Sequence, residues 1–350
     1  MSENSMSMSE RLPEAIGLLG GGVIGGGWAA RFMLNGVNVR LYDPAPNAIE
    51  LVRERLDKAR RAFRKLTNVA LPAEGLLTVV GSVAEAVRDV QIVQENAPEK
   101  LELKQKLLAE ACQAAAPETL ICSSTSCLRP SLLQAQMPRP ERLLVAHPFQ
   151  PVYLVPLVEL CAGERTAPEA LERAAAVYRA VGMYPLVVRK EIHGFIANRL
   201  QSAAWREALW LVHDGLATVK EIDDAVRYSF GLRRPVLGPI STHFVGSGAT
   251  TMRGSIEKWG PGSKDLSKLE VVPDHTDAFL NMMSEQAEAQ ASAENMTISE
   301  YQQLLDDGIV GVLQGLRSQG CGAGETLAQW EESLRNRVPS TADQARVGGK

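Results

Sequence analysis

Short apolar runs alternate with longer amphipathic stretches along the first half of the chain. The run at 15–19 is apolar apart from one glycine, which is typical of a strand buried on both faces of a sheet. The stretch at 48–66 has the apolar spacing of a surface helix. The pattern predicts strands at 15–19, 39–42, 78–80, 91–94, 119–123, 143–146, 157–161 and 184–188, with helices at 24–35, 48–66 and 101–115 and from about 167. This alternation indicates an α/β fold with a doubly wound, mostly parallel sheet.

Beyond residue 190 the pattern predicts helices alone. Apolar residues from Phe195 to His213 recur at helical spacing. Two capping boxes, Thr218-x-x-Glu221 and Thr297-x-x-Glu300, predict the starts of later helices. We therefore expect an α/β domain at 12–189 and an all-α domain at 190–334. The polar segments 1–11 and 335–350 have no periodic apolar face and are expected to be disordered tails.

The composition argues against several classes of protein. The chain has 350 residues, enough for two packed cores, and a formal net charge of −4 without clusters of Lys and Arg, so we expect no nucleic-acid or membrane partner. No apolar run reaches transmembrane length and no signal peptide is evident, so we expect a cytoplasmic protein. The five cysteines are widely spaced and form no CxxC pair, which argues against a disulfide framework or a metal site.

A glycine-rich motif follows the first predicted strand, where a helix is expected to begin. Gly20, Gly22 and Gly25 satisfy G-x-G-x-x-G in the sequence GGGVIG, and Val23 and Ile24 complete the motif. The first glycine allows a tight turn, the second lets the backbone approach a pyrophosphate, and the third lets the helix pack on the strand. The motif and its context predict a dinucleotide site.

An acidic residue at the end of the second strand refines this prediction. Asp43 lies 18 residues past Gly25, where a carboxylate can accept hydrogen bonds from ribose hydroxyls and would repel a 2′-phosphate. Pro44 and Ala45 follow it, where an NADP site would favour Arg or Lys. We therefore expect a preference for NAD over NADP.

Polar residues near other strand ends are of the types that alcohol oxidation needs. A base must take the hydroxyl proton, and neutral imidazole suits that role near pH 7. His147 is the only histidine at a predicted strand end, and three prolines between it and Glu159 favour a reversing connection that could bring the carboxylate beside the ring. Ser126 and Asn198 are candidates for holding the reacting oxygen. Taken singly, each residue also fits a structural role, such as a helix N-cap for Ser126.

Four ordered motifs in roughly the first two thirds of the chain resemble those of the 3-hydroxyacyl-CoA dehydrogenase family. They are GGGVIG at 20–25, STSC at 124–127, HPFQPVYLVPLVEL at 147–160 and GFIANRL at 194–200. The resemblance implies a Rossmann domain joined to a helical dimerisation domain, with NAD as cofactor and a homodimer as the assembly. It implies that His147 is the general base, that Glu159 is its partner, and that Ser126 and Asn198 bind the substrate oxygen.

The resemblance extends to the segment APEKLELK and has two departures. Glu99 and Lys104 in this segment are similar to the family's residues near the nicotinamide end of the cofactor. Family members usually have Asn where this chain has Ser124, and again where it has Gln150.

The resemblance also bears on the substrate, which we expect to be a small β-hydroxy acid. The segments GGGVIGGGWAARF, HPF and WREAL favour oxidation of L-carnitine to 3-dehydrocarnitine, with a 3-hydroxyacyl-CoA and L-gulonate as alternatives. A trimethylammonium group is best held by aromatic faces and a carboxylate by an arginine, for which Phe149, Tyr153, Trp205 and Arg199 are among the candidates. These side chains also fit core packing or a solvated surface. The alternative from another class is a dinucleotide-binding structural protein with little turnover.

Overall fold

The first half of the chain forms one eight-stranded sheet. The computed structural model describes residues 12–236, 238–247, 255, 274, 276–279, 281–282 and 297–337. The strands are β1 (Ala15–Leu19), β2 (Asn38–Tyr42), β3 (Leu77–Val79), β4 (Ile92–Glu95), β5 (Leu120–Ser123), β6 (Leu143–Pro148), β7 (Leu157–Ala162) and β8 (Tyr184–Val188). Their order is β3-β2-β1-β4-β5-β6-β7-β8, and every neighbouring pair is parallel except β6 and β7. The predicted doubly wound, mostly parallel sheet is therefore confirmed.

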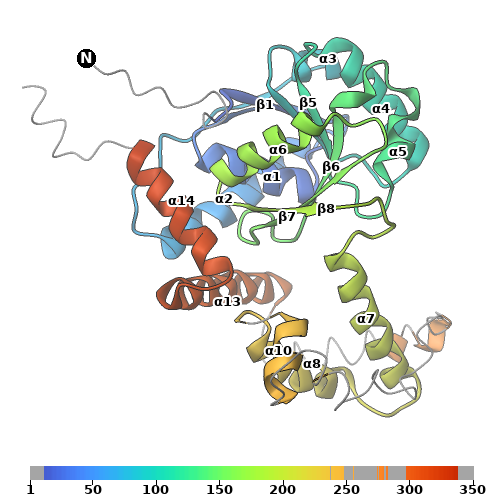
Figure 1. Cartoon of the computed structure of the whole chain (residues 1–350), viewed down its shortest axis with the longest axis vertical. Helices are drawn as coiled ribbons and strands as arrows, with labels where there is room; N and C mark the ends of the chain where they lie inside the picture. The colour runs from blue at the N-terminus through green and yellow to red at the C-terminus, as the bar shows by residue number, and fades with distance from the viewer. Residues whose placement is uncertain are drawn as a thin grey trace, which may run out of the picture. The chain divides into compact units, whose positions relative to one another are not determined.

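Helices cover both faces of this sheet (Figure 1). They are α1 (Val23–Leu34), α2 (Ala48–Leu66), α3 (Val83–Val87), α4 (Leu101–Ala114), α5 (Pro130–Leu133) and α6 (Pro168–Ala180). Trp28 of α1 packs on Tyr178 of α6 with ring centroids 5.2 Å apart. The helices α1, α2 and α6 lie on one face of the sheet, and α3, α4 and α5 lie on the other. From β1 the chain adds strands in one direction along the sheet, and from β4 it adds them in the other, so right-handed connections place their helices on opposite faces.

Local sequence explains most of these elements. All five residues of β1 are buried, as expected for a central strand with helices on both faces. The helix α2 buries Val52, Leu56, Ala59 and Phe63, which recur every three or four residues along one face. The sequence missed the short helices α3 and α5, whereas the reversing connection expected between His147 and Glu159 is present as the antiparallel pair β6 and β7.

The chain divides into two compact units, and the last helix belongs to the first of them. The first unit includes 12–196, 309–313 and 325–337, and the second includes the described residues within 197–308 and 314–324. In α14 (Ala323–Arg337), Trp330 packs edge-on against Phe63 with ring centroids 5.2 Å apart and donates a hydrogen bond from Nε1 to Asn35 Oδ1 at 2.7 Å. Glu331 accepts a hydrogen bond from Thr67 at 2.6 Å. The sequence placed this helix in the all-α domain because its own spacing does not reveal its packing partner.

The second unit is helical. It contains α7 (Ala197–His213), α8 (Val219–Arg227), α9 (Phe230–Arg233), α10 (Pro239–Ser247) and most of α13 (Ile298–Gln319). Both predicted capping boxes are present, at Thr218 for α8 and Thr297 for α13. None of the helices within the described ranges is both long and apolar enough to cross a bilayer.

The predicted tails fall largely outside the described residues. The segments 1–11 and 338–350 are not described, whereas residues 335–337 extend α14 to Arg337, which donates a hydrogen bond to the carbonyl oxygen of Ala180 at 2.9 Å. The stretch from Ser241 to Asp274 is described only at 241–247, 255 and 274.

Candidate active site

The loop between β1 and α1 contains close approaches that only glycine permits. Gly20 has a φ of +96°, and a Cβ there would lie 2.9 Å from the carbonyl oxygen of Asn96. A Cβ on Gly25 would lie 1.9 Å from the carbonyl oxygen of Gly20. A Cβ on Gly22 would meet nothing within 4 Å, and α1 begins at Val23 without a side-chain cap. The loop is tightly packed on its inner side and leaves a helix N-terminus accessible, which fits the pyrophosphate of a dinucleotide.

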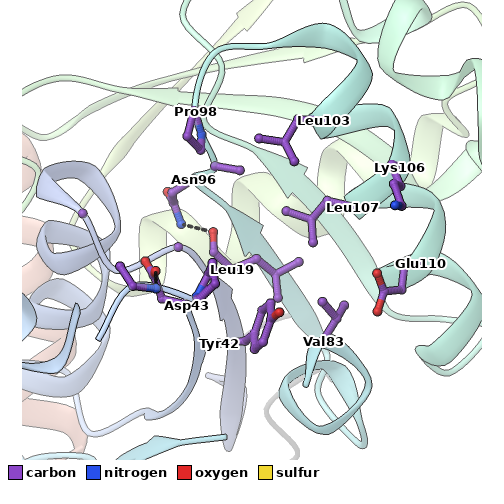
Figure 2. A pocket seen from close by; sticks show the side chains of 15 residues that line it. Leu19, Tyr42, Asp43, Val83, Asn96, Pro98, Leu103, Lys106, Leu107 and Glu110 are labelled. Atoms are coloured by element: carbon purple, nitrogen blue, oxygen red, sulfur yellow. Dashed lines mark hydrogen bonds between the residues drawn. The ribbon is translucent and has the colours of Figure 1, made fainter. Parts of the chain in front are cut away.

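A pocket of about 630 Å³ lies beside this loop, at the carboxyl ends of β1, β2 and β4 (Figure 2). Since β1 and β4 are neighbours in the sheet but not in the chain, the pocket occupies the topological switch point where open α/β sheets bind ligands. Figure 2 shows Asp43 on one side of the pocket and Leu107 and Glu110 of α4 on the other. Apolar side chains such as Val83 and Leu107 line the space between them, which suits an adenine ring.

The carboxylate of Asp43 is fixed by backbone hydrogen bonds. Its Oδ2 accepts from the N–H of Gly21 at 2.6 Å, and its Oδ1 accepts from the N–H of Ala45 at 2.8 Å. The first bond ties the end of β2 to the glycine loop. The carboxylate therefore faces the pocket in one defined orientation, as discrimination at a ribose hydroxyl requires.

We predict that Asp43→Asn weakens the preference for NAD. The amide keeps the size of the side chain but removes the negative charge that would repel a 2′-phosphate. The ratio of kcat/KM for NAD to that for NADP should fall by about ten-fold or more, equivalent to roughly 1.4 kcal/mol. Steady-state kinetics with both cofactors measure this ratio. Glu110→Gln, on the opposite wall of the pocket, is the matched control and should leave the ratio unchanged. Comparable turnover of both cofactors by the unaltered chain would contradict the assignment of Asp43.

The antiparallel pairing of β6 and β7 places His147 directly opposite Glu159. Nδ1 of His147 lies 3.0 Å from Oε2 of Glu159, and the two side chains are 7% and 0% exposed. The other carboxylate oxygen, Oε1, accepts the N–H of Ile196 at 2.9 Å. When Nδ1 carries the proton and donates it to this carboxylate, Nε2 has a free lone pair. The pair can therefore present a basic nitrogen held in a fixed orientation.

Two phenylalanine rings enclose the imidazole. The ring centroid of Phe149 is 4.7 Å from that of His147, and the centroid of Phe195 is 5.5 Å away. Phe195 is fully buried although its φ is +49°, a left-handed conformation that is unfavourable for a bulky residue. It follows Gly194, whose φ is +75°. The packing of the Phe195 ring against His147 and the bond from Ile196 to Glu159 hold this segment in place.

Glu99 lies in the loop between β4 and α4 and accepts hydrogen bonds from the loop that follows β5. Its Oε1 accepts hydrogen bonds from the hydroxyl of Thr125, from the N–H of Ser126 at 3.0 Å and from the N–H of Cys127 at 3.2 Å. Partial burial would raise the pKa of Glu99, but the bonds from Thr125 and Cys127 and the charge of Lys104 outweigh it and lower the pKa. Glu99 is therefore ionised at neutral pH and fixes the backbone around Ser126.

Lys104 is buried beneath this loop and links two carboxylates. Its Nζ lies 2.7 Å from Oε1 of Glu95 and 3.5 Å from Oε2 of Glu99. Glu95 is fully buried and also accepts the hydroxyl of Ser123 at 2.5 Å. The sequence analysis named Glu99 and Lys104 as candidates but did not name Glu95, which the structure places in contact with Lys104. The sequence feature that could have identified Glu95 is its place as an acidic residue at the end of a buried strand, β4.

Ser124, the first departure from the family pattern, is the centre of a second network that the sequence did not predict. Its Oγ accepts from Trp28 Nε1 at 2.9 Å and from Gln94 Nε2 at 2.7 Å, and it donates to Asn96 Oδ1 at 2.8 Å. Gln94 in turn accepts from the hydroxyl of Tyr178 at 2.5 Å. This network joins α1, β4 and α6 behind the cofactor loop, so the serine has a structural role of its own.

The remaining predicted site residues lie in both units. In the first unit, Ser126 is half-buried beside Glu99, and Tyr153 is buried in the connection between β6 and β7. In the second unit, Asn198 is the second residue of α7 and is half-buried, while Arg199 and Trp205 on the same helix are exposed. Within the described residues, no group of three His, Cys, Asp or Glu side chains is placed to hold a metal ion.

The chain belongs to the 3-hydroxyacyl-CoA dehydrogenase family. The model of its NAD-binding domain matches residues 15–192, and that of its C-terminal domain matches residues 194–278. L-carnitine dehydrogenase of Mesorhizobium japonicum is 44% identical over 87% of this chain and 84% of its own length. L-carnitine dehydrogenase of Pseudomonas aeruginosa strain PAO1 is also 44% identical, over 89% of this chain and 96% of its own length.

Two solved structures are similar to most of this chain. The 5-formyl-3-hydroxy-2-methylpyridine 4-carboxylic acid 5-dehydrogenase, an NAD⁺-dependent dismutase, has a TM-score of 0.70 and 27% identity, and covers 87% of this chain and 98% of its own. FadB2 of M. tuberculosis has a TM-score of 0.59 and 25% identity, over 79% of this chain and 95% of its own. The chain is thus an NAD-dependent oxidoreductase that acts on a hydroxyl group, and the expected family and cofactor are confirmed.

Proposed function

We propose that the chain oxidises the 3-hydroxyl of L-carnitine to 3-dehydrocarnitine, with NAD as oxidant and His147 as the general base. The observation that carries the mechanism is the 3.0 Å contact between the buried side chains of His147 and Glu159. The relatives named L-carnitine dehydrogenase support the substrate, because they are 44% identical to this chain over most of both sequences.

In the proposed reaction, side chains of the protein accept the proton of the substrate hydroxyl and stabilise the charge that results. NAD, when bound, accepts the hydride. His147 takes the hydroxyl proton at Nε2, while Glu159 holds the proton at Nδ1 and stabilises the imidazolium that forms. Glu159 is fully buried, so water does not screen its attraction for that charge. Ser126 and Asn198 are proposed to donate hydrogen bonds to the substrate oxygen.

The substrate assignment makes specific chemical demands. A trimethylammonium group donates no hydrogen bonds and is held best by aromatic faces, for which we propose Phe149, Tyr153 and Trp205. A carboxylate at the other end is proposed to pair with Arg199. Phe149 already lies beside His147, with ring centroids 4.7 Å apart.

We predict that purified enzyme with NAD prefers L-carnitine to 3-hydroxybutyryl-CoA and to L-gulonate. Its kcat/KM for L-carnitine should be higher by about ten-fold or more, since each ten-fold preference requires only about 1.4 kcal/mol of differential binding. Initial rates of NADH formation at 340 nm measure all three substrates under the same conditions. D-carnitine is the stereochemical control. A clear preference for the acyl-CoA would refute the carnitine assignment while leaving the proposed base intact.

A structural protein with little turnover is the rival from another class. A buried carboxylate is costly unless it is paired, and here it is paired with an imidazole beside the cofactor domain's strand ends, which favours catalysis.

The proposal also includes a cytoplasmic homodimer built through the helical unit. Exposed apolar side chains on α7, α9 and α10, such as Leu200, Leu232 and Ile240, support the dimer. Sedimentation velocity would show the mass of a single chain if the dimer proposal is wrong.

A further inference from the structure

Arg31 is a buried cation near the C-terminal end of the cofactor helix α1, only 4% exposed. Within the described residues its hydrogen bonds all go to backbone carbonyl oxygens. Nε donates to Val152 at 2.8 Å and Nη2 donates to Val155 at 3.4 Å. Nη1 donates to Val181 at 3.1 Å and to Gly182 at 3.2 Å. The Arg31 side chain thus joins α1 to the segment at 152–155 and to the turn at 181–182.

No acidic side chain in the described structure shares this charge. Burial lowers the pKa of the Arg31 guanidinium to about 9, with no charged neighbour contributing, so the group is still protonated at neutral pH. A buried cation without an anion destabilises a fold relative to an apolar side chain of similar volume. The bonds of Arg31 to four carbonyl groups offset this cost, so the role of the arginine depends on which segments those carbonyl groups belong to.

The carbonyl groups of Val152 and Val155 belong to the connection between the two proposed catalytic residues. This connection, residues 149–156, lies between β6 with His147 and β7 with Glu159. At its end the carbonyl oxygen of Pro156 accepts the N–H of Tyr184 in β8 at 2.7 Å, but residues 149–155 belong to no strand pair of the described sheet. Val152 is buried, so its carbonyl group needs a partner from outside the sheet. Arg31 supplies that partner and fixes the connection against α1.

One face of α1 is built for this contact. Gly27, Arg31 and Asn35 lie four residues apart and so share a face of the helix. A Cβ on Gly27 would lie 2.8 Å from Cβ of Val152, so the helix approaches the connection as closely as glycine allows. Asn35 donates to the carbonyl oxygen of Arg31 at 2.9 Å and accepts from Trp330 Nε1 at 2.7 Å. This face therefore runs from the connection to α14.

We propose that Arg31 is a positioning residue for the oxidation. The N-terminus of α1, at Gly22 and Val23, is the proposed contact with the cofactor. Arg31, two turns further on, fixes the same helix to the connection between His147 and Glu159. The helix then sets the distance between the cofactor and the imidazole. This inference rests on the proposed role of His147 as the base.

The test compares Arg31→Lys with Arg142→Lys. Arg142 is a second buried arginine that donates to backbone carbonyls, those of Cys112, Ala116 and Thr119, but it precedes β6 at the end away from His147. Both substitutions keep the charge and lose the guanidinium fork. R31K should lower kcat about ten-fold or more, because a displacement of ~1 Å near a reacting group costs up to about 100-fold. R142K should leave kcat within about two-fold of the unaltered enzyme, and neither should change the Kd of NAD by more than about two-fold.

A second variant reaches the same connection without changing any charge. Gly27→Ala places a methyl group against Val152 and should lower kcat as R31K does, even if R31K folds poorly. The deuterium isotope effect on kcat, with deuterium at the carbinol carbon, should rise in both variants because hydride transfer becomes slower than product release. A loss of folded protein alone would not change this ratio. Equal losses of kcat in R31K and R142K, or an R31K enzyme with unchanged kcat, would overturn the proposal.

The kinetics use whichever of L-carnitine, 3-hydroxybutyryl-CoA and L-gulonate the unaltered enzyme oxidises fastest, so failure of the carnitine assignment does not affect the test. If none is oxidised, the proposed function fails, and hydrogen exchange then decides the role of Arg31. Amides of residues 149–156 should exchange faster in R31K than in R142K. Unchanged exchange in this connection would refute the positioning role independently of any substrate.

Discussion

Replacement of His147 by alanine is expected to abolish NADH production while leaving the affinity for NAD nearly intact. General base catalysis contributes about 10²- to 10⁴-fold to rates of this kind, so kcat should fall by that factor. The cofactor pocket is lined by residues at or just past the ends of β1, β2 and β4 and by residues of α3 and α4. None of these residues contacts His147 through a hydrogen bond in the described structure. Single-turnover formation of NADH and calorimetric titration with NAD measure the two effects separately.

Several controls make the His147 experiment decisive. His213→Ala alters a histidine on α7 that is 40% exposed on its side chain and should turn over at nearly the rate of the unaltered enzyme. Added imidazole should partly restore the activity of His147→Ala if the missing group is a base. Unchanged turnover in His147→Ala would remove the proposed mechanism.

Glu159→Gln is expected to give the second large loss, although the amide has the size of the carboxylate. If the amide oxygen keeps the bond from Ile196, the amide NH₂ faces Nδ1 of His147. Nδ1 must then accept, Nε2 carries the proton, and the ring can no longer act as a base. A wrong tautomer of this kind costs up to about 10⁴-fold in a serine-protease triad, so we expect a loss of kcat of about 10²- to 10⁴-fold.

This loss should not come with unfolding, which circular dichroism and thermal melting would show. The matched control is Glu164→Gln, an exposed glutamate just past the end of β7, which should behave as the unaltered enzyme does. If Glu159→Gln retained full activity, the carboxylate would have no part in orienting the ring. A large loss in Glu159→Gln together with normal activity in His147→Ala would be inconsistent with the pair acting as a unit.

Much of the α/β unit could be predicted because its signals are local. The strand at Ala15–Leu19 and the helix at Ala48–Leu66 have the predicted bounds, since each is defined by its own apolar spacing. The glycine loop was predictable for the same reason, because the backbone there has room for no other residue at Gly20 or Gly25. The pairing of His147 with Glu159 followed from prolines that favour a reversal between them.

Long-range contacts could not be predicted from spacing. Arg31 reaches Val152 across 121 residues, and Trp330 reaches Asn35 across 295 residues. One signal for Arg31 was present, since it is a single charge in the run WAARFML, where its neighbours are buried. Nothing in the spacing of α14 identifies its partner, because an amphipathic helix shows only that it packs, not where.

The return of α14 to the first unit has a consequence for how the chain can fold. Phe63, Asn35 and Gly182 belong to segments made early in synthesis, yet their cover, Trp330, emerges from the ribosome about 150 residues after β8 is complete. During synthesis, the surface of the α/β unit around Phe63 and Asn35 therefore stays exposed to solvent until α14 has been translated. A fragment that stops at Ile196 would lack the contacts of Trp330 with Phe63 and Asn35, so we expect it to be less stable than the same residues in the full chain.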